Sequence, residues 1–307
     1  MSAPLYMQLG PQRVPYTGTR TTRVFGVIGH PVRHSLSPRF QGAALRSLGL
    51  DAVYLTFDVE PSELAACVRR MREHAVRGTL AGVNVTLPHK SAIRSELDDL
   101  DGVARVTGAV NTIQFESPAP GAVALRGFNT DVAGLIQALA DAGVSLRGVP
   151  VVVVGAGGAA RAAVVAALRE GASEVRVANR SVARAREMLD ALSASWRGRL
   201  PQLTCAALVP AAGALLDGAR VLVQATSLGL RAADPSPLDL AAAPPELFVL
   251  ETIYNPAETT LLRAARARGL RARNGLGMLV HQGAAALRIW TDRQPPLDVM
   301  RRSRGLD

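Results

Sequence analysis

A glycine-rich turn between an apolar strand and a helix limits what this chain can fold into more than any other feature. Residues 149–154 read Val-Pro-Val-Val-Val-Val, and the run Gly155-Ala156-Gly157-Gly158-Ala159-Ala160 then opens a helical stretch to about Glu170. A continuously apolar strand is typical of a parallel sheet that is covered on both faces. The form G-x-G-x-x-A after such a strand is the fingerprint of dinucleotide binding. A glycine-rich packing turn is the weaker alternative, so we expect a Rossmann-like domain.

The small residues of this run have separate predicted tasks. Gly155 allows the tight turn, Gly157 lets a pyrophosphate approach the backbone, and Ala160 lets the helix pack closely on the strand. The N-terminus of the helix offers free N–H groups and a positive dipole end to the phosphates. The run therefore predicts a cofactor-binding loop made of Gly155, Ala156, Gly157, Gly158 and Ala159.

The end of the next strand indicates which dinucleotide is bound. Residues 174–179 (EVRVAN) lead into Asn179-Arg180-Ser181, and Arg184 follows. An NAD-binding strand would end in Asp or Glu, which holds the ribose 2′-hydroxyl. Two guanidinium groups instead suit a 2′-phosphate, so the sequence favours NADP. Arg186, nearby, is interpreted as an ordinary exposed helix arginine.

Strands and helices also alternate ahead of the glycine run, which predicts an α/β protein of two domains with a parallel layer in each. We expect a flexible leader over 1–22, an N-terminal α/β substrate domain over 23–130 plus 275–307, and a C-terminal Rossmann-like NADP-binding domain over 131–274. A deep cleft is expected between the two domains. The last helical stretch, about 277–290, is expected to cross back onto the first domain.

Lysine is the rarest basic residue in the chain. Lys90 is the single lysine among 35 Lys and Arg residues. Arginine does not lose its proton at usable pH, whereas lysine can. A retained lysine is therefore a candidate for proton transfer, against the alternative of a surface lysine left by chance.

Asparagine is similarly scarce, and three of the six asparagines lie around Lys90 and Asp131: Asn84, Asn111 and Asn129. An amide supplies a donor and an acceptor together, which suits the binding of a polyol. Turn formation is the alternative role. It fits Asn84 poorly, because Val83 and Val85 flank that residue as in a strand.

Two serines follow the first apolar strand, residues 24–29. Ser35 and Ser37 lie in a loop at the strand end and can jointly hold a carboxylate. Ser37 before Pro38 could also be a helix N-cap, and both roles are compatible.

Seven motifs in order resemble the shikimate dehydrogenase family, over residues from about 23 to 296. They are Ser35-x-Ser37-Pro38, Asn84-Val85-Thr86-x-Pro88-x-Lys90, Gly108-Ala109-Val110-Asn111-Thr112, Gly127-x-Asn129-Thr130-Asp131, the Gly155 loop with Asn179-Arg180, Tyr254-Asn255-Pro256, and Gly275-Leu276-Gly277-Met278-Leu279-Val280-x-Gln282. The resemblance implies an NADP-dependent oxidoreductase that reduces 3-dehydroshikimate reversibly to shikimate in aromatic amino-acid (chorismate) biosynthesis.

The resemblance also implies residue roles. Lys90 and Asp131 form the catalytic pair. The substrate residues are Ser35 and Ser37 at the carboxylate, with Tyr254 nearby, and Asn84, Thr86, Asn111 and Gln282 at the ring hydroxyls. On the cofactor side, Met278 lies by the nicotinamide, and Thr226, Gly275, Asn179, Arg180, Ser181 and Arg184 contribute. Helix core is the alternative for Met278. No metal is needed, because the hydride comes from the cofactor.

Two positions depart from the family pattern, and two rival functions stay open. Glu251 stands where many relatives have Asp, and Gln224 stands where Asn is commoner. One rival is a quinate/shikimate dehydrogenase using NAD or NADP. The other is a non-catalytic ligand sensor, which the presence of both Lys90 and Asp131 disfavours.

Composition narrows the remaining classes. The net charge of +10 is spread along the chain and aromatics are 4%, so we expect no nucleic-acid partner. No apolar run approaches the roughly 18 residues of a membrane helix, and residues 1–22 lack a signal-peptide core. Cys67 and Cys205 are expected to be free thiols, although one disulfide is possible. We therefore expect a cytoplasmic monomer or homodimer.

Overall fold

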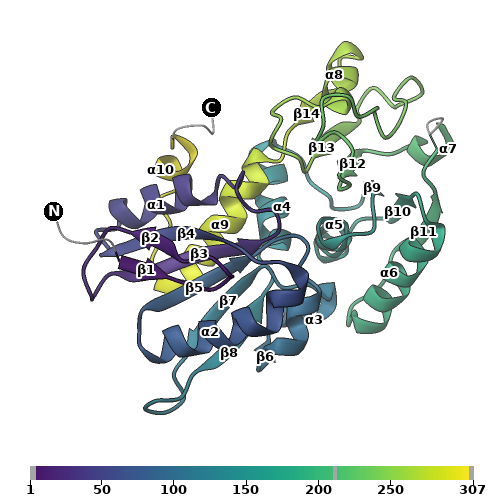
Figure 1. Ribbon diagram of the computed structural model, residues 1–307. Coiled ribbons are helices and arrows are strands. Elements are labelled where there is room, and N and C mark those ends of the chain that lie inside the picture. The colour runs from purple at the N-terminus through teal and green to yellow at the C-terminus, as the bar shows by residue number, and fades with distance from the viewer. Residues whose placement is uncertain (1–4, 210–212, 304–307) are drawn as a thin grey trace. The chain divides into compact units, whose positions relative to one another are not determined.

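The computed structural model describes residues 5–209 and 213–303. Its contacts divide the chain into two units (Figure 1). Unit 1 holds the described residues up to Thr130 and those from Gln282 onward, and unit 2 runs from Asp131 to His281. The sequence-based boundaries differ at the C-terminal side, because residues 275–281 belong with unit 2.

Unit 2 is built on a six-stranded, fully parallel sheet in the order β11-β10-β9-β12-β13-β14. The strands are β9 (Pro150–Val154), β10 (Glu174–Asn179), β11 (Gln202–Ala207), β12 (Val221–Gln224), β13 (Phe248–Glu251) and β14 (Arg271–Arg273). Its helices are α4 (Asp131–Asp141), α5 (Gly158–Glu170), α6 (Val182–Ser195), α7 (Gly213–Leu216) and α8 (Thr260–Ala267). The sheet order is that of a Rossmann fold, and the expected fold class is confirmed.

The apolar run that predicts this fold occupies the middle of the sheet. Val151 to Val154 of β9 are each at most 1% exposed, because β10 and β12 flank the strand and helices cover it. The order of the strands changes direction beside β9, so the glycine loop lies at the topological switch point where such sheets bind ligands.

Unit 1 holds a second six-stranded sheet, in the order β4-β3-β5-β7-β8-β6. The strands are β3 (Arg23–Gly29), β4 (Ala52–Asp58), β5 (Leu80–Val85), β6 (Asp99–Leu100), β7 (Thr112–Glu116) and β8 (Ala124–Phe128). The sheet is mixed, because β7 runs antiparallel to both β5 and β8. The expectation of a wholly parallel layer is therefore wrong here: β7 and β8 form a hairpin, without a crossover helix.

Helices cover both faces of this sheet (Figure 1). They are α1 (Ser37–Ser47), α2 (Leu64–Val76), α3 (Gly102–Thr107) and α10 (Leu297–Arg301), with short 3-10 turns η1 (Pro61–Glu63) and η2 (Ala92–Glu96). Helix α9 (Leu276–Thr291) begins in unit 2 and continues into unit 1. There the Gln41 side chain donates to the Gly283 carbonyl and Trp290 Nε1 donates to the Ile113 carbonyl, each at 2.9 Å.

The expectation of a flexible leader over 1–22 is wrong from residue 5 onward, where the chain is folded. Residues 1–4 lie outside the described part. Strands β1 (Leu5–Met7) and β2 (Val14–Tyr16) form an antiparallel hairpin. Met7 and Leu9 are at most 2% exposed and belong to the core of unit 1. The Arg70 guanidinium donates to the carbonyls of Leu9 and Gly10. The prolines of this segment predict an unstructured chain, but its apolar residues pack in the core of unit 1.

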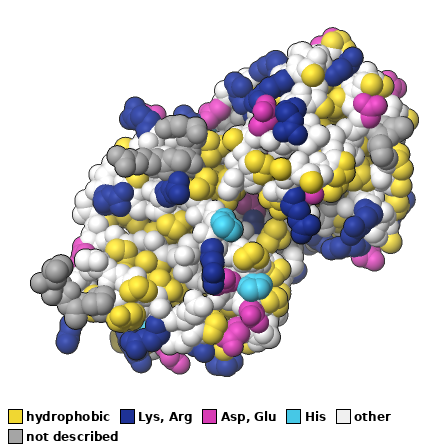
Figure 2. All heavy atoms as spheres, turned by 45° about the horizontal axis from the view of Figure 1, so that its top comes forward, with side chains coloured by type: hydrophobic (Ala, Val, Ile, Leu, Met, Phe, Trp, Pro, Cys, Tyr) yellow, Lys and Arg dark blue, Asp and Glu magenta, His cyan; other side chains and the backbone are white. Residues whose placement is uncertain are grey.

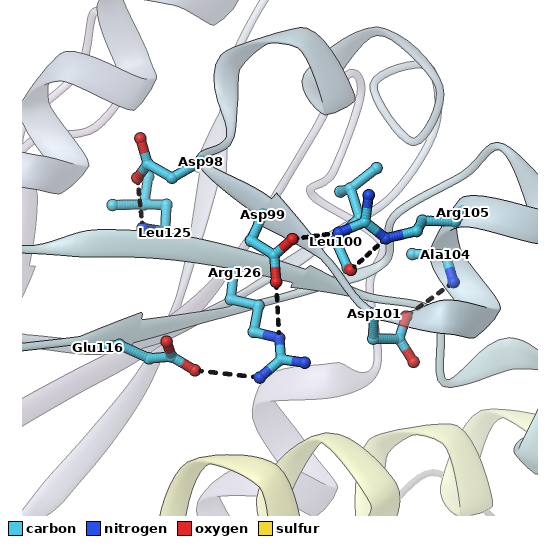
Figure 3. A network of polar contacts seen from close by, with 9 residues as sticks. All are labelled: Asp98, Asp99, Leu100, Asp101, Ala104, Arg105, Glu116, Leu125 and Arg126. Atoms are coloured by element: carbon cyan, nitrogen blue, oxygen red, sulfur yellow. Dashed lines mark hydrogen bonds and ion pairs between the residues drawn. The ribbon is translucent and has the colours of Figure 1, made fainter. Parts of the chain in front are cut away.

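Charged side chains form a network at the edge of the same sheet where the short strand β6 lies (Figure 3). The Arg126 guanidinium lies 3.3 Å from the Asp99 carboxylate and 3.6 Å from that of Glu116, and Arg105 pairs with Asp99. Asp101 accepts a hydrogen bond of 2.7 Å from the Ala104 N–H and so caps α3. Helix α3 ends at Thr107 and has Gly108 as its C-cap, so this network anchors the segment that leads to Asn111.

Both cysteines are free, as expected. On the face drawn in Figure 2, Lys and Arg side chains are scattered among acidic and apolar ones. Over the described residues, no helix combines the length and the apolar character needed to cross a membrane.

Candidate active site

The glycine loop after β9 has two glycines with different needs. Gly155 has φ +119°, a conformation that side chains disfavour, and an added Cβ would lie 2.8 Å from the Ala225 carbonyl oxygen. Gly157 has extended backbone, and an added Cβ would point into open space. Gly157 is also the N-cap of α5, whose first N–H groups need partners. A glycine that the fold itself does not require fits the close approach of a pyrophosphate.

Substituting each glycine by alanine is expected to separate folding from cofactor binding. Gly155→Ala should lower the free energy of unfolding by roughly 1–3 kcal/mol, because the residue is held at positive φ against a carbonyl. Gly157→Ala should leave the melting temperature unchanged and weaken binding of NADP by about tenfold or more. Thermal melts and fluorescence titration with NADPH measure the two effects. Equal cofactor affinity in Gly157→Ala and the unaltered protein would contradict the assignment.

The predicted 2′-phosphate residues lie at the start of α6. Ser181 is the N-cap and accepts from the Arg184 N–H at 3.3 Å, and Asn179 donates to the Ser181 carbonyl at 2.9 Å. These bonds fix the turn, while the side chains of Arg180 and Arg184 are exposed. The described part of this turn carries no carboxylate before Glu187, so the local charge suits a phosphate dianion.

The two departures from the family pattern, Gln224 and Glu251, are register partners on β12 and β13. Both are fully buried. Gln224 accepts from the Thr226 N–H at 2.7 Å and donates to the Leu228 carbonyl at 2.8 Å. The Glu251 carboxyl accepts from the Ile253 N–H and from the Thr259 hydroxyl, both at 3.1 Å. The pair therefore holds the two loops that carry Thr226 and Tyr254.

Burial raises the pKa of Glu251 from 4.5 to about 7, although hydrogen bonds from Ile253 and Thr259 oppose the shift. At a pH below 4.5 the carboxyl is protonated in the folded and the unfolded chain. As the pH rises from 4.5 to 7 the unfolded chain ionises first, so stability is lost. Above pH 7 both states are ionised and no further loss follows.

The expected loss from this carboxyl between pH 5 and pH 8 is about 2–3 kcal/mol in the free energy of unfolding of unit 2. Urea unfolding of the unaltered protein and of Glu251→Gln at both pH values measures it. The glutamine variant should lack this part of the pH dependence, because its side chain does not ionise. Identical pH dependence in the two proteins would contradict it.

Unit 1 gathers most of the predicted substrate residues, which we call the polar cluster: Ser35, Ser37, Asn84, Thr86, Asn111 and Gln282. The Ser35 hydroxyl oxygen accepts from the Ser37 N–H at 3.2 Å. Ser37 is the first residue of α1 rather than its N-cap, which is Leu36 without a side-chain bond. Its hydroxyl is therefore not used for capping.

The amide groups of the polar cluster are bonded to one another and to the backbone. Asn84 Nδ2 donates to the Asn111 carbonyl at 3.0 Å, and Asn111 Nδ2 lies 3.4 Å from Gln282 Oε1. Asn111 Oδ1 accepts from the Thr130 N–H at 2.8 Å. Thr86 follows at the end of β5, where its N–H donates to the Ile28 carbonyl at 2.9 Å.

Lys90 is half-buried and tied to the same cluster through its backbone. Its carbonyl accepts from the Val110 N–H at 2.7 Å, and Val110 directly precedes Asn111. Asp131, the first residue of α4, is buried and belongs to unit 2 with Tyr254, Met278 and Gly275. Pairing of Lys90 with Asp131, and the roles of these unit 2 residues, stay predictions.

Gly275 has a structural reason to be glycine. An added Cβ would lie 2.1 Å from the Thr252 carbonyl oxygen. The N–H of Gly275 donates to the Ile253 carbonyl at 3.0 Å. The start of α9 is thereby pressed against the loop that carries Tyr254. Met278 is 7% exposed, and its cofactor role remains a prediction beside that of helix core.

Sequence reasoning missed Tyr54, Thr112 and Thr130 as members of the buried hydrogen-bond network around the polar cluster. Tyr54 donates to Asn84, and the hydroxyl of Thr112 accepts from the same amide. Tyr54 lies inside an alternating strand, where an aromatic residue is expected on packing grounds alone. The one available signal is that the chain holds only four tyrosines.

Three family profiles match the chain. Residues 27–113 match the shikimate dehydrogenase substrate binding domain, residues 137–207 match shikimate / quinate 5-dehydrogenase, and residues 275–303 match the shikimate 5′-dehydrogenase C-terminal domain. Together they cover more than half of the sequence and include parts of both units. The protein is therefore an α/β oxidoreductase that is built of two structural units. It belongs to the shikimate dehydrogenase family.

Similar proteins carry names of the same kind. Shikimate dehydrogenase (NADP(+)) of Rubrobacter xylanophilus is 45% identical over 286 residues, which are 92% of this chain and 95% of that protein. The same enzyme of Geobacter metallireducens is 44% identical over 92% of this chain and 96% of its own. Shikimate 5-dehydrogenase of Thermus thermophilus, solved with NADP(H) and shikimate, is 38% identical with a TM-score of 0.77, covering 91% of this chain and 97% of its own.

Proposed function

We propose that the chain is an NADP-dependent shikimate dehydrogenase, which reduces 3-dehydroshikimate reversibly to shikimate. The observation that carries the proposal is the joint presence of a complete polar cluster in unit 1 and an NADP-type loop in unit 2. Relatives named for this activity match the chain along more than nine-tenths of its length.

The cofactor residues fit the NADP that the family implies. Gly157 and the N-terminus of α5 suit the pyrophosphate, and the exposed guanidinium groups of Arg180 and Arg184 suit the 2′-phosphate. When bound, NADPH supplies the hydride for the reduction and NADP⁺ takes it back in the reverse direction. Thr226 and Met278 are proposed as further contacts, at the loop after β12 and in α9.

Lys90 is the proposed proton donor. Reduction of a ketone places negative charge on its oxygen, and a protonated amine within hydrogen-bond reach stabilises that charge and delivers the proton. In the reverse direction the same amine accepts the proton from the hydroxyl. No metal ion is needed in either direction.

Asp131 is proposed to orient the Lys90 amine and to accept from a ring hydroxyl. The backbone supports this pairing. The Lys90 carbonyl accepts a hydrogen bond from the Val110 N–H. The next residue, Asn111, accepts a hydrogen bond from the Thr130 N–H through its side chain, and Asp131 directly follows Thr130 in the chain. Short links therefore connect the two residues through the polar cluster.

The polar cluster is proposed to hold the substrate at two ends. Ser35 and Ser37, in one turn before α1, take the carboxylate, with Tyr254 beside it. Burial raises the pKa of Tyr254, so its phenol stays protonated and can donate. The ring hydroxyls are taken by Asn84, Thr86, Asn111 and Gln282.

A dehydrogenase assay with the purified protein tests this function. We expect rapid reduction of NADP⁺ with shikimate, followed as nicotinamide absorbance, and much slower reaction with quinate or with NAD⁺. Preference for quinate and NAD⁺ would establish the quinate/shikimate alternative. Binding of shikimate without any reduction would instead establish a ligand sensor.

We further propose that the protein acts in the cytoplasm as a monomer or homodimer. Its two free thiols support a reducing compartment. Sedimentation of the purified protein measures the oligomeric state.

A further inference from the structure

Tyr54 lies in the middle of β4 and joins two residues of the polar cluster that come from different elements. Its hydroxyl donates to Asn84 Oδ1 on β5 at 2.7 Å. The side chain of Ser37 on α1 lies close enough to the phenol to lower its pKa. Strand β3 lies between β4 and β5, so the tyrosine reaches across a whole strand to make this contact. Tyr54 and Asn84 are 7% and 6% exposed.

The direction of each hydrogen bond follows from one backbone carbonyl. Asn84 lies 3.0 Å from the Asn111 carbonyl oxygen, which can only accept, so the NH₂ group of the Asn84 amide must face it. The second hydrogen of that NH₂ group is used on the Thr112 hydroxyl oxygen at 3.0 Å. Asn84 Oδ1 therefore faces Tyr54, and the phenol must donate to it. Because its proton is used there, the phenol oxygen can serve Ser37 only as an acceptor.

This order of donors limits what Asn84 can do. Both of its N–H groups are occupied, whereas Oδ1 keeps one lone pair free. Asn84 can therefore accept from a substrate hydroxyl but cannot donate to one without breaking a buried bond. The Ser37 hydroxyl, in turn, can turn its proton toward the phenol oxygen, and a stronger acceptor, such as a carboxylate, draws that proton away.

The tyrosine ring is held independently of its hydroxyl. The Tyr54 and Trp290 ring centroids are 6.4 Å apart, and the indole N–H of Trp290 donates to the Ile113 carbonyl. Gly82 leaves room for that indole, since an added Cβ would lie 2.5 Å from it. Burial also raises the pKa of the Tyr54 phenol, which keeps the donor proton in place.

We propose that Tyr54 is a positioning residue for the substrate: its hydroxyl sets Asn84 as an acceptor for a ring hydroxyl and presents Ser37 to the carboxylate. The proposal rests on the proposed function and deepens it. The Tyr54 hydroxyl is hydrogen-bonded to Asn84, a proposed substrate residue, so its effect should fall on substrate binding alone.

Tyr54→Phe tests the proposal, because it keeps the ring and removes only the hydroxyl. We expect KM for shikimate and the Kd of shikimate to rise about tenfold, because Asn84 Oδ1 loses its buried donor and Ser37 loses the acceptor beside it. KM for NADP⁺ should not change, and kcat should change by less than about twofold. Calorimetric titration with shikimate and steady-state kinetics give these values.

Tyr16→Phe is the matched control. Tyr16 is a half-buried tyrosine of β2 that packs against the core of unit 1. Its variant should bind shikimate as the unaltered protein does. In addition, Tyr54→Phe should have a much smaller effect in an Asn84→Ala background, because the two side chains act as one unit.

Several results would overturn the proposal: unchanged shikimate affinity in Tyr54→Phe, an equal change in Tyr16→Phe, additive effects with Asn84→Ala, or loss of the fold. An equal rise in KM for both substrates would also overturn it. The proposed function fails separately, if the unaltered protein binds shikimate without oxidising it. In that case calorimetry alone still decides the role of Tyr54.

Discussion

Lys90→Ala is expected to lower kcat for shikimate oxidation by about 10²–10⁴-fold, the range typical of lost general acid–base catalysis. KM for shikimate should change little, because the substrate's carboxylate and ring hydroxyls are assigned to residues of the polar cluster and not to Lys90. A fall in kcat without a matching rise in KM is the signature of an interaction made in the transition state. Steady-state kinetics, with formation of NADPH followed by its absorbance, measures both constants.

Lys90→Arg separates charge from proton transfer. The guanidinium keeps the positive charge but does not release a proton at usable pH. We expect its kcat to be nearly as low as that of Lys90→Ala. If Lys90→Arg keeps high turnover, Lys90 acts through its charge alone, and near-normal turnover in Lys90→Ala would remove Lys90 from the mechanism.

Joint replacement of Arg180 and Arg184 by alanine should lower the preference for NADP⁺ over NAD⁺ by about 100-fold. Hydrogen bonds to charged groups contribute about 1.5–3 kcal/mol each, and exposure of both side chains reduces that value through solvent screening. The change should appear in kcat/KM for NADP⁺, while kcat/KM for NAD⁺ stays the same. The ratio of the two constants is the measurement.

Arg186→Ala is the control for this prediction. Arg186 is an exposed arginine on the same helix, α6, and its removal takes one positive charge away from the same part of the surface. Its variant should keep the NADP⁺ preference. An equal loss in Arg186→Ala would mean that general positive charge, and no specific contact, selects the cofactor.

The Rossmann unit could be predicted because its central strands are apolar along their whole length. The expected strands at 149–154 and 174–179 correspond to β9 and β10 of unit 2. Strands β11 and β14 were not predicted. They lie at the two edges of the sheet and carry exposed residues, so their pattern resembles a loop.

The sequence pattern predicts neither the direction in which a strand runs nor the contacts between buried side chains. Alternation of apolar residues predicts β7 but does not say that it runs antiparallel. Tyr54 looks like any core aromatic until the fold brings β4 and β5 to either side of β3. Its role depends on the hydrogen-bond partner of a third residue, and no spacing in the chain encodes that.

The candidate site divides in the same way. The loop residues Gly155 and Gly157 could be assigned from local rules, because strand, turn and helix are consecutive in the chain. The polar cluster joins residues from 35 to 282, so only the family resemblance brought it together before the structure did. The reason for Gln224 and Glu251 also became visible only when their register on neighbouring strands was known.

The N-terminal hairpin has a practical consequence for anyone who shortens or tags this protein. Cutting at residue 23, where the resemblance to relatives begins, would remove Met7 and Leu9. Apolar core residues of unit 1 would then be exposed to solvent. It would also strip the threonine hydroxyls of Thr19, Thr21 and Thr22 from the Asp51 carboxylate. A tag is therefore better attached in front of the intact first strand than in place of it.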